Sequence, residues 1–114
     1  MAFVEKGQRW AFEKDINGTT PREGLTRKIL AYCDEAMCVK YYFEEGAIGT
    51  LHNHPHTQIT YVAEGAFEIE IDGEKKVVRK GDAMLKQHGV VHGALCLEKG
   101  VLINFFTPMR EEKV

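Results

Sequence analysis

The chain is a succession of short hydrophobic segments, each ended by turn-forming residues. Residues 25–33 and 36–44 are rich in Ile, Leu, Val, Tyr and Phe, side chains that favour strands. Residues 66–72 alternate strictly, with Phe67, Ile69 and Ile71 on one face and glutamates on the other, and this period of two predicts a half-buried strand. Asp72-Gly73 predicts a tight hairpin to a return strand at residues 75–79, because a type I′ turn needs positive φ at both central positions. Residues 101–106 predict a further buried strand.

The same pattern predicts an all-β fold. No segment sustains the i, i+3, i+4, i+7 spacing of an amphipathic helix, and only a short turn or helix is expected around residues 11–16. About eight to ten short strands with Gly-rich turns are typical of a sandwich or barrel. The 114 residues suit one domain. We predict a single domain over residues 1–114, with an N-terminal arm at residues 1–24 and a barrel at residues 25–110.

Composition excludes several classes of protein. The net charge is −2 and the 15 basic residues are scattered, so the chain has no nucleic-acid footprint. No apolar run approaches the roughly 20 residues that span a bilayer, and charges near the N-terminus argue against a signal peptide. The three cysteines are odd in number and lack C-x-x-C spacing. We therefore expect reduced thiols and a cytoplasmic protein.

Histidines provide the candidate chemistry. Between Gly46 and Gly65 the chain reads G-x5-H-x-H-x3-Q-x6-G, with His52, His54 and Gln58 at the polar positions. Two histidines that lie two apart on a strand project from one face and can bind one ion. Pro55 follows, as expected at an edge, kink or bulge, and Gln58, Thr60 and Val62 share a face if regular pairing resumes.

A second cluster, G-x7-G-x2-H, ends at His92. Because a hairpin separates the two clusters, a closed barrel would bring His92 across to the first pair. We predict a metal site formed by His52, His54, Gln58 and His92. Imidazole donors suit one divalent transition metal, namely Zn, Fe, Mn, Ni, Co or Cu, and suit Ca or Mg poorly.

Both clusters resemble the two motifs of the cupin family, G-x5-H-x-H-x3,4-E-x6-G and G-x5-P-x-G-x2-H-x3-N. The match runs from Gly46 to Cys96 and implies a jelly-roll-like double-stranded β-helix, the cupin barrel. The sequence departs from the motifs at three positions: Gln58 replaces the usual glutamate, Gln87 the proline and Cys96 the asparagine. With a neutral amide in place of a carboxylate, a bound ion keeps its full charge, which favours Lewis-acid chemistry over redox iron.

A longer string, residues 52–62, resembles the KdgF-type cupins of pectin and alginate breakdown. That resemblance implies a metal-dependent opening of unsaturated uronates, with a sugar acid or another small carboxylate as the ligand. The segment from Asn104 to Arg110 resembles the family pattern D-x-F-x-P-x-R. It implies that Asn104, Phe106 and Arg110 line the pocket, with Asn104 and Arg110 in catalytic positions and Phe106 and Arg110 contacting the substrate.

Asn104 departs from that pattern, because an aspartate can move a proton and an amide cannot. His56 and His88 are candidate replacements. Three hypotheses stay open: a non-redox lyase or isomerase acting on a uronate or related keto compound, a non-catalytic ligand-binding module, and an iron dioxygenase, which Gln58 disfavours. The resemblance also implies a homodimer, and the apolar residues of the arm, Phe3, Val4, Trp10 and Phe12, suit a partner barrel.

Overall fold

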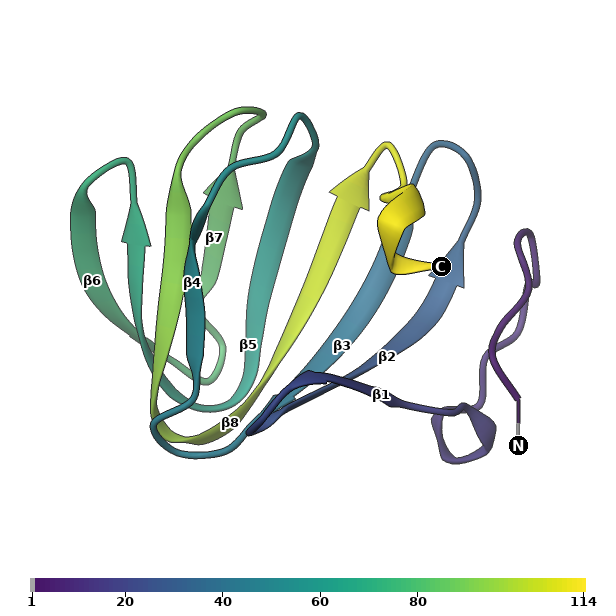
Figure 1. Ribbon diagram of the computed structural model, residues 1–114, viewed down its shortest axis with the longest axis horizontal. Coiled ribbons are helices and arrows are strands. Elements are labelled where there is room, and N and C mark those ends of the chain that lie inside the picture. Colours follow the sequence, from purple (N-terminus) through teal and green to yellow (C-terminus); the bar gives the residue numbers. More distant parts are fainter. Residues whose placement is uncertain (1) are drawn as a thin grey trace.

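The computed structural model describes residues 2–114 and consists almost entirely of antiparallel strands (Figure 1). Its strands are β1 (Thr19–Arg22), β2 (Leu25–Tyr32), β3 (Met37–Phe43), β4 (Ile48–His52), β5 (Thr57–Ile71), β6 (Glu74–Arg79), β7 (Ala83–Lys86) and β8 (His92–Thr107). Two short 3-10 helices, η1 (Glu13–Asp15) and η2 (Glu111–Lys113), lie near the ends of the chain. No helix within residues 2–114 has the length and apolar character to cross a membrane.

Two long strands, β5 and β8, join two layers of sheet. Their outer partners change along their length: β3 and β7 flank one half of the pair, whereas β4 and β6 flank the other. The large sheet therefore has the order β1-β2-β3-β8-β5-β7 and the small sheet the order β4-β8-β5-β6. The layers meet at the bottom of Figure 1 and open upward. This arrangement confirms the predicted cupin barrel.

Gly65 and Gly100 form the corner at which β5 and β8 pass from one sheet to the other. A Cβ added to Gly65 would lie 2.6 Å from the Gly100 Cα, and one added to Gly100 would lie 2.5 Å from the Glu64 carbonyl oxygen. Gly65 also has a φ of 80°, which L side chains rarely adopt. Both positions therefore require glycine for the two backbones to approach.

The hydrophobic core fills the space between the layers. Phe43 and Phe67 meet edge to face with ring centroids 5.2 Å apart, a favourable geometry for aromatic pairs. Phe67 and Ile69 are buried and Glu68 and Glu70 are half-buried, as the alternation predicted. The core cluster consists of Leu25, Met37, Val39, Tyr41, Phe43, Val62, Phe67, Ile69, Cys96, Leu102, Phe106 and Met109.

The predicted strands are present, with some boundaries moved. Residues 66–72 and 101–106 are the second halves of the two long strands, which begin earlier at Thr57 and His92. The sequence pattern hid this continuity because the corner glycines read as turn residues. Asp72 and Gly73 have φ values of 50° and 82°, which confirms the tight hairpin. The expected short helix is η1.

The N-terminal arm packs against its own barrel through Glu13. Its carboxylate accepts hydrogen bonds from Lys40 Nζ and from the Tyr42 hydroxyl, the latter at 2.5 Å. These two contacts hold the pKa of Glu13 at about 2. Phe3, Trp10 and Phe12 remain largely exposed, so the arm does not bury its own aromatic side chains.

We expect Gly65→Ala to lower the free energy of unfolding by about 2–4 kcal/mol, because its methyl group would overlap backbone that cannot move aside. Gly73→Ala is the matched control, since it also has positive φ but faces open space, and should cost about 1 kcal/mol. Urea unfolding followed by circular dichroism measures both. Equal losses in the two variants would show that the close approach at the corner is unimportant.

Candidate metal centre and cavity

Three histidines converge at the open end of the barrel. His52 ends β4 and His92 begins β8, and the two are paired across the ladder. His54 lies beyond the end of β4, so the prediction that both first-cluster histidines share one strand face was wrong, although the loop still turns both rings inward. The ring centroids are 4.4 Å apart for His52 and His92 and 5.0 Å for His54 and His92.

The three rings offer nitrogen atoms to one point. One ring nitrogen from each histidine lies within 4.8 Å of the others, so these residues could hold a metal ion. The Nδ1 atoms of His52 and His92 contact the carbonyl oxygens of Thr50 at 2.8 Å and Val90 at 3.0 Å. Such bonds to the second nitrogen fix the tautomer and leave Nε2 free to coordinate. His92 Nε2 is indeed buried without a hydrogen-bond partner among the described residues.

Burial keeps these imidazoles neutral. Desolvation lowers the pKa of His52 and His54, and it lowers the pKa of His92 to about 4. A neutral imidazole has the free lone pair that a metal requires, and no proton must leave before it binds at neutral pH. The donor set therefore fits a divalent transition metal.

Gln58 adds an oxygen atom to the cluster. Its Oε1 lies 3.0 Å from His54 Nε2, and its side chain is buried. Its Nε2 donates to the Thr60 hydroxyl at 3.1 Å. The amide is thus oriented with its oxygen toward the histidines, where a metal ligand would need it.

Thr60 is the centre of a buried hydrogen-bond network. Its hydroxyl accepts from Gln58 Nε2 and from Lys86 Nζ, the latter at 3.0 Å, and donates to Asn104 Oδ1 at 2.6 Å. A hydroxyl has one proton and two lone pairs, so Thr60 is fully satisfied. Because Lys86 can only donate, one amide must donate to Thr60 and the other must accept from it. This constraint turns the Asn104 amide nitrogen away from Thr60.

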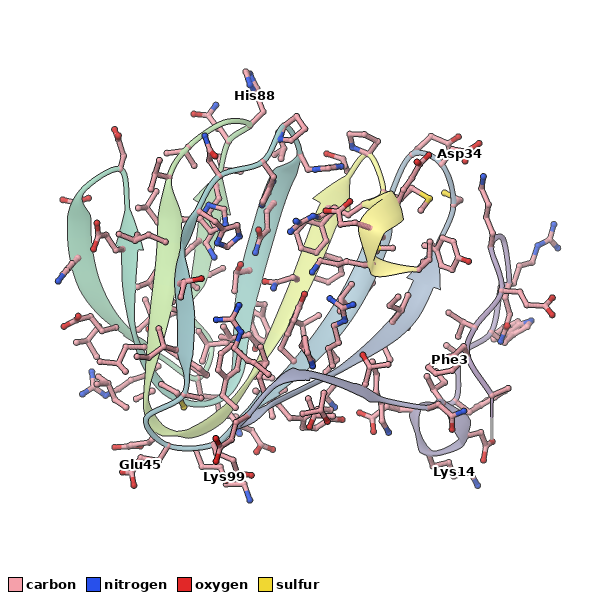
Figure 2. The ribbon with its side chains drawn as sticks, viewed as in Figure 1. Phe3, Lys14, Asp34, Glu45, His88 and Lys99 are labelled. Atoms are coloured by element: carbon pink, nitrogen blue, oxygen red, sulfur yellow. The ribbon has the colours of Figure 1, made fainter. Side chains whose placement is uncertain are left out.

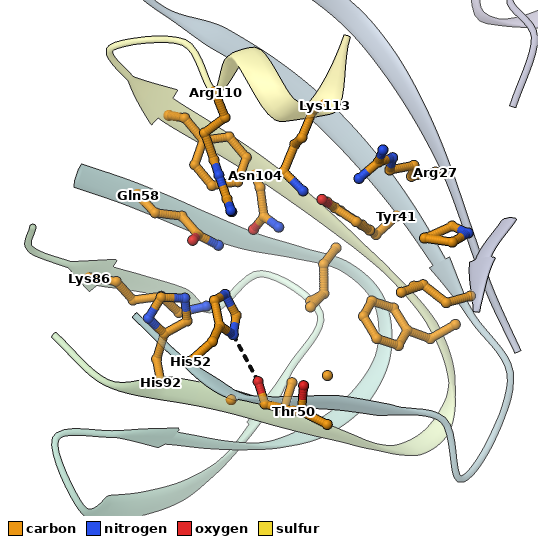
Figure 3. A pocket seen from close by; sticks show the side chains of 18 of the residues that line it. Arg27, Tyr41, Thr50, His52, Gln58, Lys86, His92, Asn104, Arg110 and Lys113 are labelled. Atoms are coloured by element: carbon orange, nitrogen blue, oxygen red, sulfur yellow. Dashed lines mark hydrogen bonds between the residues drawn. The ribbon is translucent and has the colours of Figure 1, made fainter. Parts of the chain in front are cut away.

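The predicted pocket residues line one cavity of about 330 Å³ (Figure 3). Asn104 and Phe106 share a face of β8, and both are buried. Arg110 places its guanidinium carbon 5.2 Å from the centroid of the Phe106 ring, and its Nε donates to Glu112 at 2.6 Å. The cavity also includes three of the four candidate metal ligands, His52, Gln58 and His92, and His54 lies beside them without lining it. The structure therefore brings the candidate metal ligands close to the candidate substrate contacts.

Sequence reasoning missed four basic residues of the cavity, which are Arg22, Arg27, Lys86 and Lys113. Lys86 is only 4% exposed, and burial lowers its pKa to about 8. Arg27 lies on β2 and Lys113 on η2, beside Tyr41 at the other end of the cavity (Figure 3). The alternation of side chains along the strands could have indicated two of them. Arg27 lies two residues after the buried Leu25 on β2, and Lys86 lies two residues after Met84 on β7, so each points to the same side of its strand as that residue. No local pattern marked Lys113.

The two spare histidines lie outside the cavity. His56 has its ring centroid 5.5 Å from that of His54, but it belongs neither to the metal cluster nor to the cavity lining. His88 is exposed at the tip of the β7–β8 connection (Figure 2). Neither ring is placed to exchange a proton directly with a ligand in the cavity.

The cupin domain model matches residues 39–103, a stretch that runs from β3 to near the end of β8 and holds all three clustered histidines. Fold, motif spacing and site geometry agree with this match. The chain therefore belongs to the cupin family.

Comparison with individual proteins shows which kind of cupin the chain resembles. The pectin degradation protein KdgF of Dickeya dadantii (strain 3937) is 45% identical over 103 residues, which span 85% of this chain and 94% of that protein. The structure of KdgF from Halomonas sp. matches with a TM-score of 0.91 and 37% identity, covering 94% of this chain and 99% of that one. An RmlC-like cupin from Shewanella frigidimarina NCIMB 400 matches with a TM-score of 0.94 and 37% identity, covering 97% and 100%. These similarities place the chain with the KdgF-type cupins.

We expect Thr60→Val to destabilise the protein and to weaken metal binding, because it removes the hydroxyl that Gln58, Lys86 and Asn104 share. The loss of unfolding free energy should be about 1–3 kcal/mol, and metal affinity should fall at least 10-fold as the Gln58 amide loses its orientation. Urea unfolding and calorimetric titration with Ni²⁺ measure the two effects. Thr107→Val, at an exposed position of β8, is the control. Unchanged metal affinity in Thr60→Val would separate the network from the metal site.

Proposed function

We propose that this cupin binds one divalent late transition metal through His52, His54, Gln58 and His92, and acts on a uronate or related keto compound as a non-redox lyase or isomerase. The observation that carries the proposal is a set of neutral donors facing a cavity that also contains Arg110. Identity of 45% to a pectin degradation protein supports the choice of sugar acid. When bound, a divalent ion with neutral ligands supplies Lewis acidity for polarising a substrate oxygen.

The protein's own residues would bind and orient the substrate. The Nε–H group of Arg110 donates to Glu112, and the other N–H groups of its guanidinium remain available. Such groups pair well with a carboxylate. The Phe106 ring offers an apolar surface beside it. The Asn104 amide nitrogen, which is turned away from Thr60, would donate to a substrate hydroxyl. Because an amide does not titrate, proton transfer in this proposal runs through solvent that Asn104 orders.

The test is turnover of unsaturated galacturonate by metal-loaded protein, followed by the loss of absorbance of the conjugated double bond. We expect His92→Ala to abolish turnover together with metal binding. Arg110→Met should lower kcat/KM about 10- to 100-fold, as for the loss of a charged hydrogen bond. Arg79→Met, at an exposed position of β6, should match the wild type. No turnover above the metal-free protein would refute the proposal for this substrate.

Asn104 favours a second candidate function, a non-catalytic binding module for the same class of acids. Binding of galacturonate by calorimetry without turnover would support this alternative. Oxygen uptake by iron-loaded protein would instead favour the dioxygenase hypothesis.

We also propose that the chain forms a homodimer through the outer face of the large sheet and the arm. Ile59, Leu85 and Phe105 are adjacent across three strands of this face and are 47%, 57% and 44% exposed. The groove beside them has an apolar lining that includes Phe105, Cys38 and arm residue Gly7. The exposed aromatic side chains of the arm would extend this surface. All three cysteines are free thiols, which supports the expectation of a reducing, cytoplasmic environment.

Light scattering should give a mass of twice 12.9 kDa for the wild type, and Phe105→Glu should shift it toward the monomer because a charge would be buried in the interface. Val77→Glu, at a 45% exposed position on β6, should remain dimeric. A monomeric wild type at micromolar concentration would exclude the dimer.

A further inference from the structure

The charges that line the cavity are of one sign. Five basic side chains face it: Arg22, Arg27, Lys86, Arg110 and Lys113. No Asp or Glu is among the described residues that line it, although the chain has 17 acidic residues against 15 basic ones. The acidic residues are therefore excluded from this cavity, which is the pattern expected of an anion-binding site.

Lys86 is the most deeply buried of these cations. Its side chain is almost completely buried, with 4% exposure. Its Nζ donates a hydrogen bond to the neutral Thr60 hydroxyl. Among residues 2–114 no carboxylate lies within ion-pair distance of it. Its surroundings add no negative charge, because both Gln58 and Asn104 are amides. A buried charge without a counter-charge is costly, and the remaining Nζ protons need an acceptor.

A second group of cations lies at the other end of the cavity. Arg27 Nε is buried and has no hydrogen-bond partner among residues 2–114. The Lys113 amine lies 5.3 Å from the centroid of the Tyr41 ring. Burial, followed by repulsion from Arg110 and Arg27, lowers the pKa of Lys113 to about 7. These three cations repel one another, and among residues 2–114 the one ion pair that any of them makes is Arg110–Glu112.

The two ends of the cavity lie on strands that are not neighbours. Lys86 lies on β7 and Arg27 on β2, and strands β3, β8 and β5 separate them in the large sheet. At about 4.8 Å per strand spacing, the two backbones are about 19 Å apart along the sheet, and the long Lys86 and Arg27 side chains, which line the same cavity, cover part of that distance. Figure 3 places Lys86 beside His92 and places Arg27 and Lys113 beyond Asn104.

We propose that the cavity binds an acid with two anionic groups, such as a six-carbon sugar dicarboxylate, with one group at Lys86 and the other at Arg27 and Lys113. Arg110 and the Asn104 amide nitrogen lie between the two ends and would contact the hydroxyls or the nearer carboxylate. This inference rests on the proposed use of the cavity for acid ligands and makes Lys86 a specificity residue within it. The volume of about 330 Å³ suits a ligand of that size.

The test compares galactarate with galactonate, which has the same six-carbon chain and the same C2–C5 hydroxyls but a hydroxymethyl group in place of the second carboxylate. Calorimetry on the purified protein, with its metal content measured before and after titration, should show galactarate binding at least 10-fold more tightly. Lys86→Met should remove that preference by weakening galactarate, while Lys86→Arg should retain it. Lys99→Met, whose parent side chain is 77% exposed on the far side of the corner, should leave both affinities unchanged.

Equal affinities for the two acids in the wild type would overturn the inference, and this measurement does not depend on any variant folding. An equal loss of both affinities in Lys86→Met would also overturn it, by showing that Lys86 does not distinguish the second anionic group. Preference for galactarate without turnover of unsaturated galacturonate would sustain the inference and refute the proposed enzyme. Turnover without the preference would do the reverse.

Discussion

The pairing of β5 with β8 is the constraint on which the rest of the structure depends. These two strands run through both sheets, and they can turn together only because Gly65 and Gly100 let their backbones touch at the corner. On one side of that corner the pair carries Gln58, Thr60 and Asn104, and on the other it begins at His92. This one bent ladder therefore sets the relative position of Gln58, His92, Asn104 and Phe106, while β4 contributes His52 and loops contribute His54 and Arg110.

The chemistry of the site follows from how its neutral groups are oriented. Thr60 has one proton to give, and Lys86 can only donate, so the two amides beside it must take opposite roles. Gln58 consequently presents an oxygen to the histidines, and Asn104 presents its nitrogen to the cavity. The family pattern that residues 104–110 resemble has an aspartate where this chain has Asn104, and a carboxylate there would accept from Thr60 and offset the charge of Lys86. With an amide there, the cavity keeps an excess of positive charge that a ligand must balance.

The charge of the cavity, and not the fold, is what can select a ligand. The cupin barrel is shared with the KdgF proteins and the Shewanella cupin at high structural similarity, so the fold alone does not select a substrate. Selection depends on which side chains project into the space between the sheets. Here those are imidazoles and amides at one end and basic groups at both ends.

Local pattern was enough to predict the all-β fold and the Asp72-Gly73 hairpin, because strand alternation and turn conformation are properties of neighbouring residues. The convergence of His52, His54 and His92 was predicted from motif spacing together with an assumed closed barrel. Local pattern also marked Asn104 and Arg110, through spacing shared with a known family. It did not show that β5 and β8 are continuous through their glycines, nor that Lys86, Arg27 and Lys113 enter the same cavity as the histidines. Those facts depend on contacts between residues that are far apart in the chain. Only the closed barrel decided which charges face one another. Burial makes an unpaired lysine costly and distance decides which partner it can reach, and both are set only when the chain folds.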